Sequence, residues 1–404
     1  MMAHGRPPGH GTGIEWTHAP RRKGESWNPV RAGTQPIATP EGRVYARAGW
    51  HCEHVSEGCR NCYAEGINRR LGTGLDFKPG HRGDIDIFLD EKLLTDPLRW
   101  QKPRSVFLSS MTDIFADFVS DEMLDRIFAV MALAPQHYFL VLTKRPERMR
   151  AYIESGCSDP DRDGSMPLHS ARMRAWWHMC SEGEQGSKTR FAGIPERPLW
   201  PLQNVGLGVS VEDQAAADQR IPHLLATPAG TRFVSAEPLL GPVDLRDMCN
   251  GHYFFNALTG ARWHDAEGGA HDMNGERLDW VIAGGESGDG ARPMHPDWLR
   301  SLRDQCAQAE TAFFFKQWGE WLPWEPEHGP CWKSQSGRSE DHHALFPADW
   351  DNQTKWDDGL WAVNAGETQA AFERVGKKAA GAMLDGREHR EFPPALAATG
   401  KDAS

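Results

Sequence analysis

The sequence predicts an α/β fold in which parallel strands form a partial, TIM-like barrel with insertions. Two observations predict it: short apolar runs that are continuous rather than alternating, and helical patterns between them. Continuous apolar runs are expected where strands are buried on both faces of a parallel sheet. Strands alternating with helices indicate right-handed βα repeats, in either a barrel or an open doubly wound sheet. Six or seven such units suit a partial barrel better than a closed eight-fold one.

The expected strands follow one another along most of the chain. A first strand is placed at about residues 43–50, where it leads into a cysteine-rich loop. The later strands are placed at residues 105–110, 137–143, 205–211, 231–235, 280–284 and 312–316.

Two helices are recognised by apolar stripes. Residues 121–134 place Leu124, Ile127, Phe128 and Met131 on one face, after Ser120 as the candidate N-cap. Residues 296–309 do the same with Leu299, Leu302 and Cys306.

Composition shifts predict how the chain is divided. Residues 1–13 are expected to be a flexible tail and residues 14–320 the barrel, with insertions at about 156–204 and 246–277. Tryptophans crowd the following segment, so a C-terminal aromatic cap is expected at 321–393. Residues 394–404 are expected to be disordered.

The bulk composition excludes some classes of protein. A net charge of −11 gives no general attraction to nucleic acid. No apolar stretch approaches the roughly 20 residues of a membrane span, and the N-terminal residues lack the apolar core of a signal peptide. We therefore expect a cytoplasmic protein whose eight cysteines are reduced rather than paired in disulfides.

The most informative segment holds Cys52, Cys59 and Cys62. Three thiolates within eleven residues can hold a metal centre on one short loop. Three ligands are one too few to complete a tetrahedral zinc site or a four-iron cluster, so a coordination position stays open for catalysis.

Zinc is the competing interpretation of this segment. His51 and His54 flank Cys52, so a site of three cysteines and one histidine can be imagined. Zinc modules usually carry two short cysteine pairs, however, and only Cys59 and Cys62 form one here. The spacing therefore favours an iron–sulfur cluster over zinc.

The carboxyl ends of the expected strands are unusually polar. In α/β folds, ligands collect at this edge of the sheet, and the cysteine loop is expected to open onto it. The residues proposed there for cofactor or substrate binding are Ser110, Asp113, Ser210, Glu212, Glu237, Gly284, Gly285 and Glu286. Lys144 and Lys316, which follow two other strands, are candidate catalytic groups that stabilise charge or donate protons.

Several motifs together carry a resemblance to a known family. They are residues 27–30, 55–65, 107–113, 142–146, 208–212, 237–241, 284–288, 314–319 and 374–378. On these residues the chain resembles a phage-associated three-cysteine-motif family of unknown function that is related to radical S-adenosylmethionine (radical SAM) enzymes. The resemblance spans roughly residues 14–393.

The resemblance implies a fold and a chemistry. Radical SAM enzymes use a partial (βα)6-type barrel, in agreement with the unit count above. Their three cysteines, here Cys52, Cys59 and Cys62, hold a [4Fe–4S] cluster whose fourth iron is chelated by S-adenosyl-L-methionine. One electron from the cluster cleaves this cofactor, and the resulting 5′-deoxyadenosyl radical abstracts a hydrogen atom from the substrate. A cap that excludes water would shield the radical.

We therefore expect a cytoplasmic radical SAM-like enzyme. The phage association points to nucleic-acid or nucleotide modification or repair, with a protein encoded nearby as a candidate partner. The alternative is a zinc- or cluster-stabilised nucleic-acid-binding module without catalysis. A third interpretation is a structural phage component, in which the polar strand ends would be accidental. The sequence does not indicate the oligomeric state.

Overall fold

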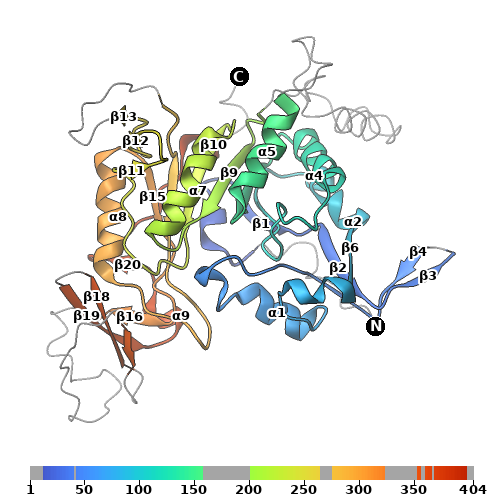
Figure 1. Cartoon of the computed structure of the whole chain (residues 1–404), viewed down its shortest axis with the longest axis horizontal. Helices are drawn as coiled ribbons and strands as arrows, with labels where there is room; N and C mark the ends of the chain where they lie inside the picture. Colours follow the sequence, from blue (N-terminus) through green and yellow to red (C-terminus); the bar gives the residue numbers. More distant parts are fainter. Residues whose placement is uncertain are drawn as a thin grey trace. The chain divides into compact units, whose positions relative to one another are not determined.

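The structure is a computed structural model that describes residues 12–40, 42–157, 201–263, 275–323, 353–355, 360–365 and 368–397 (Figure 1). The chain divides into two compact units. The first comprises Met1–Ser210, Arg220–Val234 and Phe392–Ser404, and the second comprises Val211–Gln219 and Ser235–Glu391. Much of the expected insertion at 156–204, part of that at 246–277, and much of both tails and the cap lie outside the described residues.

A seven-stranded sheet has the order β1-β7-β8-β9-β10-β14-β15. The pairs β1–β7, β7–β8, β8–β9 and β14–β15 are parallel. The strands are β1 (Lys23–Trp27), β7 (Arg104–Leu108), β8 (Tyr138–Thr143), β9 (Val205–Ser210), β10 (Thr231–Ala236), β14 (Trp280–Ala283) and β15 (Ala312–Phe315). The protein is therefore mixed α/β with a parallel sheet consistent with a partial barrel.

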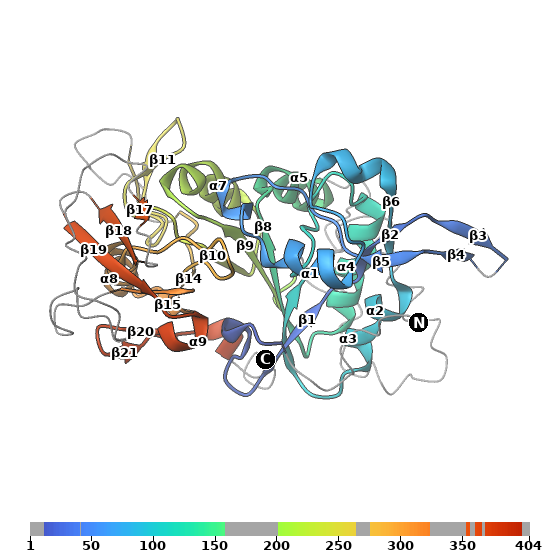
Figure 2. The same cartoon turned by 90° about the horizontal axis from the view of Figure 1, so that it is seen from below.

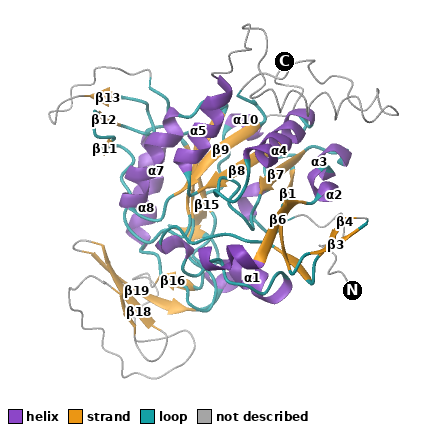
Figure 3. Ribbon diagram, turned by 45° about the vertical axis from the view of Figure 1, so that its right-hand side comes forward, coloured by secondary structure: helices purple, strands orange, loops and turns teal. Residues whose placement is uncertain are grey.

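The α-helices described are short to medium in length. They are α1 (Tyr63–Leu71), α2 (Glu91–Leu94), α3 (Asp96–Arg99), α4 (Asp121–Leu133), α5 (Pro146–Cys157), α7 (Gln214–Ala226), α8 (Pro296–Gln308), α9 (Lys377–Ala380) and α10 (Pro394–Ala397). Helices α4 and α5 lie beside strands β7, β8 and β9 (Figure 3). None of the helices in the described ranges is long and apolar enough to cross a bilayer.

Six of the expected strands and both expected helices are confirmed within one or two residues. Ser120 caps α4 as predicted, because its Oγ accepts a hydrogen bond from the backbone N–H of Met123 at 3.3 Å. The buried stripe of α8 includes Leu299, Leu302 and Cys306.

The expected first strand is wrong. Residues 43–50 instead contribute β4 (Gly42–Val44) and β5 (Arg47–Gly49), which are largely exposed and belong to small antiparallel sheets. The sheet begins with β1, which pairs in parallel with β7. Strand β1 was not expected from the sequence because it contains charged residues. Glu25 forms an ion pair with Arg104 of the neighbouring strand, and this pairing allows a polar segment to lie at the edge of the sheet.

The first unit also carries antiparallel elements around the cysteine segment. Strands β2 (Val30–Thr34) and β6 (Ile85–Leu89) pair on one side, and β2 also pairs with β5. Strands β3 (Ile37–Thr39) and β4 form a hairpin that extends away from the neighbouring strands (Figure 2). Short 3₁₀ turns are η1 (Glu15–Thr17), η2 (Glu57–Cys59) and η3 (Pro79–Asp84).

The second unit contains three small sheets besides β14, β15 and α8 among the residues described. One is antiparallel, from β11 (Met248–Cys249), β12 (Phe254–Phe255) and β13 (Arg262–Trp263). Another has the order β16-β19-β18-β17 and includes β16 (Trp321–Pro323), β17 (Gln353–Lys355), β18 (Leu360–Ala365) and β19 (Thr368–Arg374). A third pairs β20 (Met383–Leu384) with β21 (Arg387–Glu388).

His137 is buried in the first unit as a neutral ring. Its Nδ1 accepts from the Arg104 backbone N–H at 3.1 Å, and its Nε2 lies 3.1 Å from the Pro97 carbonyl, to which it donates. Burial, with help from the charges of Arg104 and Arg22, lowers the pKa of His137 to about 4. Protonation would put a hydrogen on the nitrogen that now accepts.

Stability is therefore expected to fall in mild acid. The unfolded chain binds a proton at its ordinary histidine pKa near 6.5, whereas the folded chain does not until about 4. His137 thus contributes fully above pH 6.5, and about 2 kcal/mol of its contribution should be lost by pH 5. The free energy of unfolding in urea, measured above pH 6.5 and at pH 5, should depend less on pH in His137→Leu than in the parent. Exposed His252→Gln is the control, and an equal slope in His137→Leu and the parent would contradict the assignment.

Candidate functional site

The three cysteines occupy different local structures in the first unit. Cys52 follows β5 and is half-buried, Cys59 ends the turn η2, and Cys62 is the N-cap of α1. Cys52 and Cys62 pack against a small apolar cluster of Ala64, Phe77 and Met111. The loop therefore has one apolar wall built by α1 and the residues that follow β7.

The thiols are electrostatic neighbours. Cys62 influences the pKa of Cys52, and Cys59 influences that of Cys62. Across the described ranges, however, no three His, Cys, Asp or Glu side chains converge in an arrangement that would already hold a metal ion. The donor set still fits a thiophilic metal centre, because three soft sulfur ligands lie on one short segment.

The thiols of Cys52 and Cys62 need compensation to ionise. Burial, together with the Asp113 carboxylate, raises the pKa of Cys52 to about 12, while the Asp113 backbone N–H and Arg145 oppose the shift. Burial also raises the pKa of Cys62, opposed by the backbone N–H groups of Glu65 and Ala64. A bound cation favours thiolates, so this environment is suited to cysteines that ionise with their metal.

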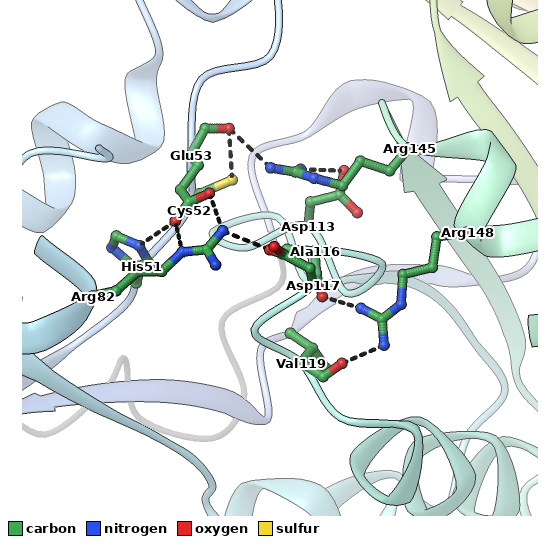
Figure 4. A network of polar contacts seen from close by, with 10 residues as sticks. All are labelled: His51, Cys52, Glu53, Arg82, Asp113, Ala116, Asp117, Val119, Arg145 and Arg148. Atoms are coloured by element: carbon green, nitrogen blue, oxygen red, sulfur yellow. Dashed lines mark hydrogen bonds and ion pairs between the residues drawn. The ribbon is translucent and has the colours of Figure 1, made fainter. Parts of the chain in front are cut away.

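Glu53, next to Cys52, is held at both ends (Figure 4). Arg82 donates to both of its carboxylate oxygens, through Nε to Oε1 and through Nη2 to Oε2 at 2.6 Å. Arg145 donates from Nη2 to its backbone carbonyl at 3.3 Å. Arg82 also reaches Asp117 at 2.6 Å. The segment that carries the first cysteine is thereby tied to residues following β7 and β8.

Asp113, predicted as a cofactor-binding residue, directs its carboxylate to protein donors. Oδ1 accepts from the Phe115 N–H at 3.0 Å and the Thr143 hydroxyl at 2.8 Å. Oδ2 accepts from the same hydroxyl at 2.9 Å, the Lys144 N–H at 3.0 Å and Arg145 Nη1 at 3.1 Å. Lys144, the first candidate catalytic group, therefore reaches this network through its backbone.

The turn after β7 contains Ser110, another predicted site residue. Ser110 exchanges side-chain hydrogen bonds with Asn28, and its carbonyl accepts from the Tyr63 hydroxyl at 2.9 Å. Tyr63 directly follows Cys62, so this turn also contacts the cysteine segment. Ser109 starts the turn with a left-handed φ of 56°.

The same turn holds two further hydroxyls, which belong to the polar strand end but were not among the predicted binding residues. Ser109 and Thr112 are at least nine-tenths buried. Among the residues that the structure describes, Ser109 Oγ and Thr112 Oγ1 have no hydrogen-bond partner. A buried polar atom without a partner is costly, so these hydroxyls are suited to a polar ligand group at the end of β7.

The two histidines invoked for zinc contact carboxylates. His51 Nε2 lies 3.4 Å from Glu53 Oε1, and His54 Nε2 lies 3.3 Å from Glu65 Oε2. Burial lowers the pKa of His51. A zinc ligand role for either nitrogen would require it to leave its present neighbour.

The remaining predicted residues lie at or after strand ends β9, β10, β14 and β15. Ser210 ends β9 in the first unit, buried, with its carbonyl accepting from Arg220 at 2.8 Å. In the second unit, Glu212 is 1% exposed, and its carbonyl accepts from the Leu240 N–H at 2.7 Å.

Glu237 and Lys316 form a mostly buried pair in the second unit. Lys316 Nζ lies 3.2 Å from Glu237 Oε1, and the Ser235 hydroxyl donates to Oε2 at 3.1 Å. Gly284 lies against this carboxylate: a Cβ there would come within 2.6 Å of Glu237 Oε1. The structure thus brings together three predicted residues from β10, β14 and β15, with an ammonium and a carboxylate able to share a proton.

Gly285 and Glu286 have structural partners in the second unit. Gly285 approaches the backbone of Trp318 so closely that a Cβ would lie 1.8 Å from its carbonyl oxygen. The Glu286 carboxylate accepts from the Arg292 backbone N–H at 2.8 Å, from Nε at 2.9 Å and from Nη2 at 2.8 Å. Sequence reasoning missed Arg82, Arg145 and Arg292 as partners, because such pairings depend on the fold and not on spacing.

Comparison with known proteins adds a family and no activity. A family profile matches residues 11–393, and that family is described as "Protein of unknown function (DUF5131)". No curated protein and no solved structure matches the chain.

Proposed function

The chain belongs to the DUF5131 family, and because that description assigns no activity, we propose a function from the chain's own residues. In this proposal, the protein is a cytoplasmic iron–sulfur enzyme of the radical SAM type that modifies or repairs a nucleic acid or nucleotide. The observation that carries the proposal is the set of three neighbouring thiols beside the polar turn after β7.

Cys52, Cys59 and Cys62 are the proposed ligands of a [4Fe–4S] cluster. When bound, the cluster would supply one electron to S-adenosyl-L-methionine, which is how such centres start radical chemistry. The open coordination position left by a three-cysteine set supports this assignment over a closed structural site. The buried hydroxyls of Ser109 and Thr112 offer donors to a polar cofactor group.

Other residues are proposed to handle substrate and protons. In the second unit, the Glu237–Lys316 pair is suited to hold or deliver a proton at Lys316 Nζ, and the bare Gly284 backbone leaves room for the Glu237 carboxylate. Lys144, which follows β8 in the first unit, is proposed as a second cationic group. Ser110 and Ser210 are the other proposed binding residues of the first unit, and Glu212, Gly285 and Glu286 are those of the second. The Asp113 carboxylate is instead occupied by protein donors.

The finer architecture is part of the same proposal. We propose that the parallel sheet is a (βα)6-type barrel and that the segment from residue 321 is its aromatic cap. A protein encoded nearby is the proposed partner. The antiparallel sheet of β16–β19 supplies a framework for such a cap.

Anaerobic purification tests the proposal directly. The protein should be brown and carry about four irons and four sulfides per chain. With S-adenosyl-L-methionine and dithionite it should release 5′-deoxyadenosine, measured by liquid chromatography. A colourless protein with one zinc and no such product would instead support a binding module without catalysis.

A further inference from the structure

The proposed function assigns the metal ligands. The contacts around Glu53 indicate, in addition, residues that position one of these ligands. From the geometry we infer that Asp113 and Arg145 are positioning residues for Cys52: they fix the segment that carries the first cysteine without touching metal or substrate. Glu53, Arg82, Asp113 and Arg145 are together called the Glu53 clamp. The inference rests on the proposed function only in taking Cys52 as a ligand.

Arg145 is the connecting residue of the clamp. One guanidinium nitrogen, Nη1, binds Asp113 Oδ2 at 3.1 Å, and the other, Nη2, binds the Glu53 carbonyl at 3.3 Å. Figure 4 shows the guanidinium between these two groups. Its planar fork can contact both acceptors at once, which a single ammonium group cannot do with the same geometry.

Asp113 fixes where that fork points. Its carboxylate accepts from Phe115, Thr143, Lys144 and Arg145, and its side chain is 10% exposed. A carboxylate engaged by this many protein donors is oriented before any ligand arrives. Asp113 therefore acts on Cys52 through Arg145 and the main chain.

Cys59 is held differently. Its turn η2 has no buried residue, and its backbone N–H bonds locally to the Ser56 carbonyl at 2.9 Å. The ion pair of Arg60 with Glu57 spans 3.7 Å between side chains that are each 69% exposed, and such pairs contribute little. Cys52 is thus the preset ligand, and loss of the clamp should loosen Cys52 without loosening Cys59.

The test compares Arg145→Met with the parent by alkylation of the full-length protein after anaerobic removal of iron. The rate at Cys52, followed by mass spectrometry, should rise roughly tenfold, as expected for losing hydrogen bonds to a charged group. The rate at Cys59 should stay within about twofold. Loss of the Arg145 charge alone would disfavour the Cys52 thiolate and slow the reaction, so an increase reports movement of the segment.

Arg148→Met is the matched control. Arg148 binds the carbonyls of Ala116 and Val119 in the same region, but it does not contact Glu53 among the contacts described (Figure 4). It should leave Cys52 unchanged. Arg145→Lys, which retains the charge and can satisfy one acceptor, should give an intermediate rate and covers the case in which Arg145→Met fails to fold.

Hydrogen–deuterium exchange of the peptide covering residues 51–54 gives a second readout that thiol ionisation does not influence. Faster exchange there in Arg145→Met and not in Arg148→Met supports the clamp. Unchanged exchange and alkylation in folded Arg145 variants overturn it, as does an equal rise at Cys52 and Cys59, which would mean general loosening. Iron content is measured separately, so a protein that binds no iron would refute the proposed function and leave this result standing.

Discussion

Cys59→Ala should reduce iron from about four atoms per chain to nearly none and abolish 5′-deoxyadenosine formation. Two remaining thiolates cannot hold a cluster that three sulfur ligands keep in place, so both brown colour and product should disappear together. Because η2 contains no buried residue, the variant should still fold. Circular dichroism, iron and sulfide assays, and product chromatography on one anaerobic preparation make the comparison.

Cys249→Ala is the matched control for this variant. Cys249 is exposed in β11 of the second unit, where its sulfur contacts the Gly251 N–H at 3.4 Å. It should keep colour, iron and product at the level of the parent. Full iron loading in Cys59→Ala would remove Cys59 from the ligand set, and the three-cysteine assignment would fail.

Gly285→Ala should strongly destabilise the second unit. Its Cβ would lie 1.8 Å from the Trp318 carbonyl oxygen and 2.5 Å from the carbonyl carbon, and backbone cannot move aside as a flexible side chain can. The Gly285 N–H also bonds to the Gln317 carbonyl at 2.8 Å, which holds the two segments together. We expect a loss of at least about 3 kcal/mol in urea unfolding, or insoluble protein.

Gly83→Ala separates this clash from the general effect of adding a methyl group. Gly83 lies in η3, and a Cβ there meets nothing within 4 Å. Its unfolding free energy should stay within about 0.5 kcal/mol of the parent. If Gly285→Ala were equally mild, the close approach of the two backbones would be incorrect.

The strands that sequence analysis located share one property: they are buried along nearly their whole length. All six residues of β9 and of β10 are buried, and a continuous apolar run is the pattern that predicts this. Strand β1 was missed because its sequence, Lys-Gly-Glu-Ser-Trp, contains no apolar run. Its Lys23 is exposed, whereas Trp27 is buried and contacts Phe139.

The site was predictable only where its residues are close in sequence or follow strands. The cysteine spacing identified Cys52, Cys59 and Cys62 as candidate ligands. The polar strand ends identified Glu237, Gly284 and Lys316, which the fold brings together. The arginine partners were not predictable. Arg82 meets Glu53 across 29 positions of sequence and Arg145 meets it across 92, and no local pattern encodes such contacts.

Glu286 and Arg292 have an evolutionary consequence. Their side chains are 5% and 15% exposed, so water would solvate neither charge well if the other were removed. Replacing one alone leaves an unpaired ion in the interior, whereas replacing both with apolar residues of similar volume need not destabilise the fold. Related sequences should therefore either retain both residues or have lost both in the same lineage. Few descendants should carry one of the two alone.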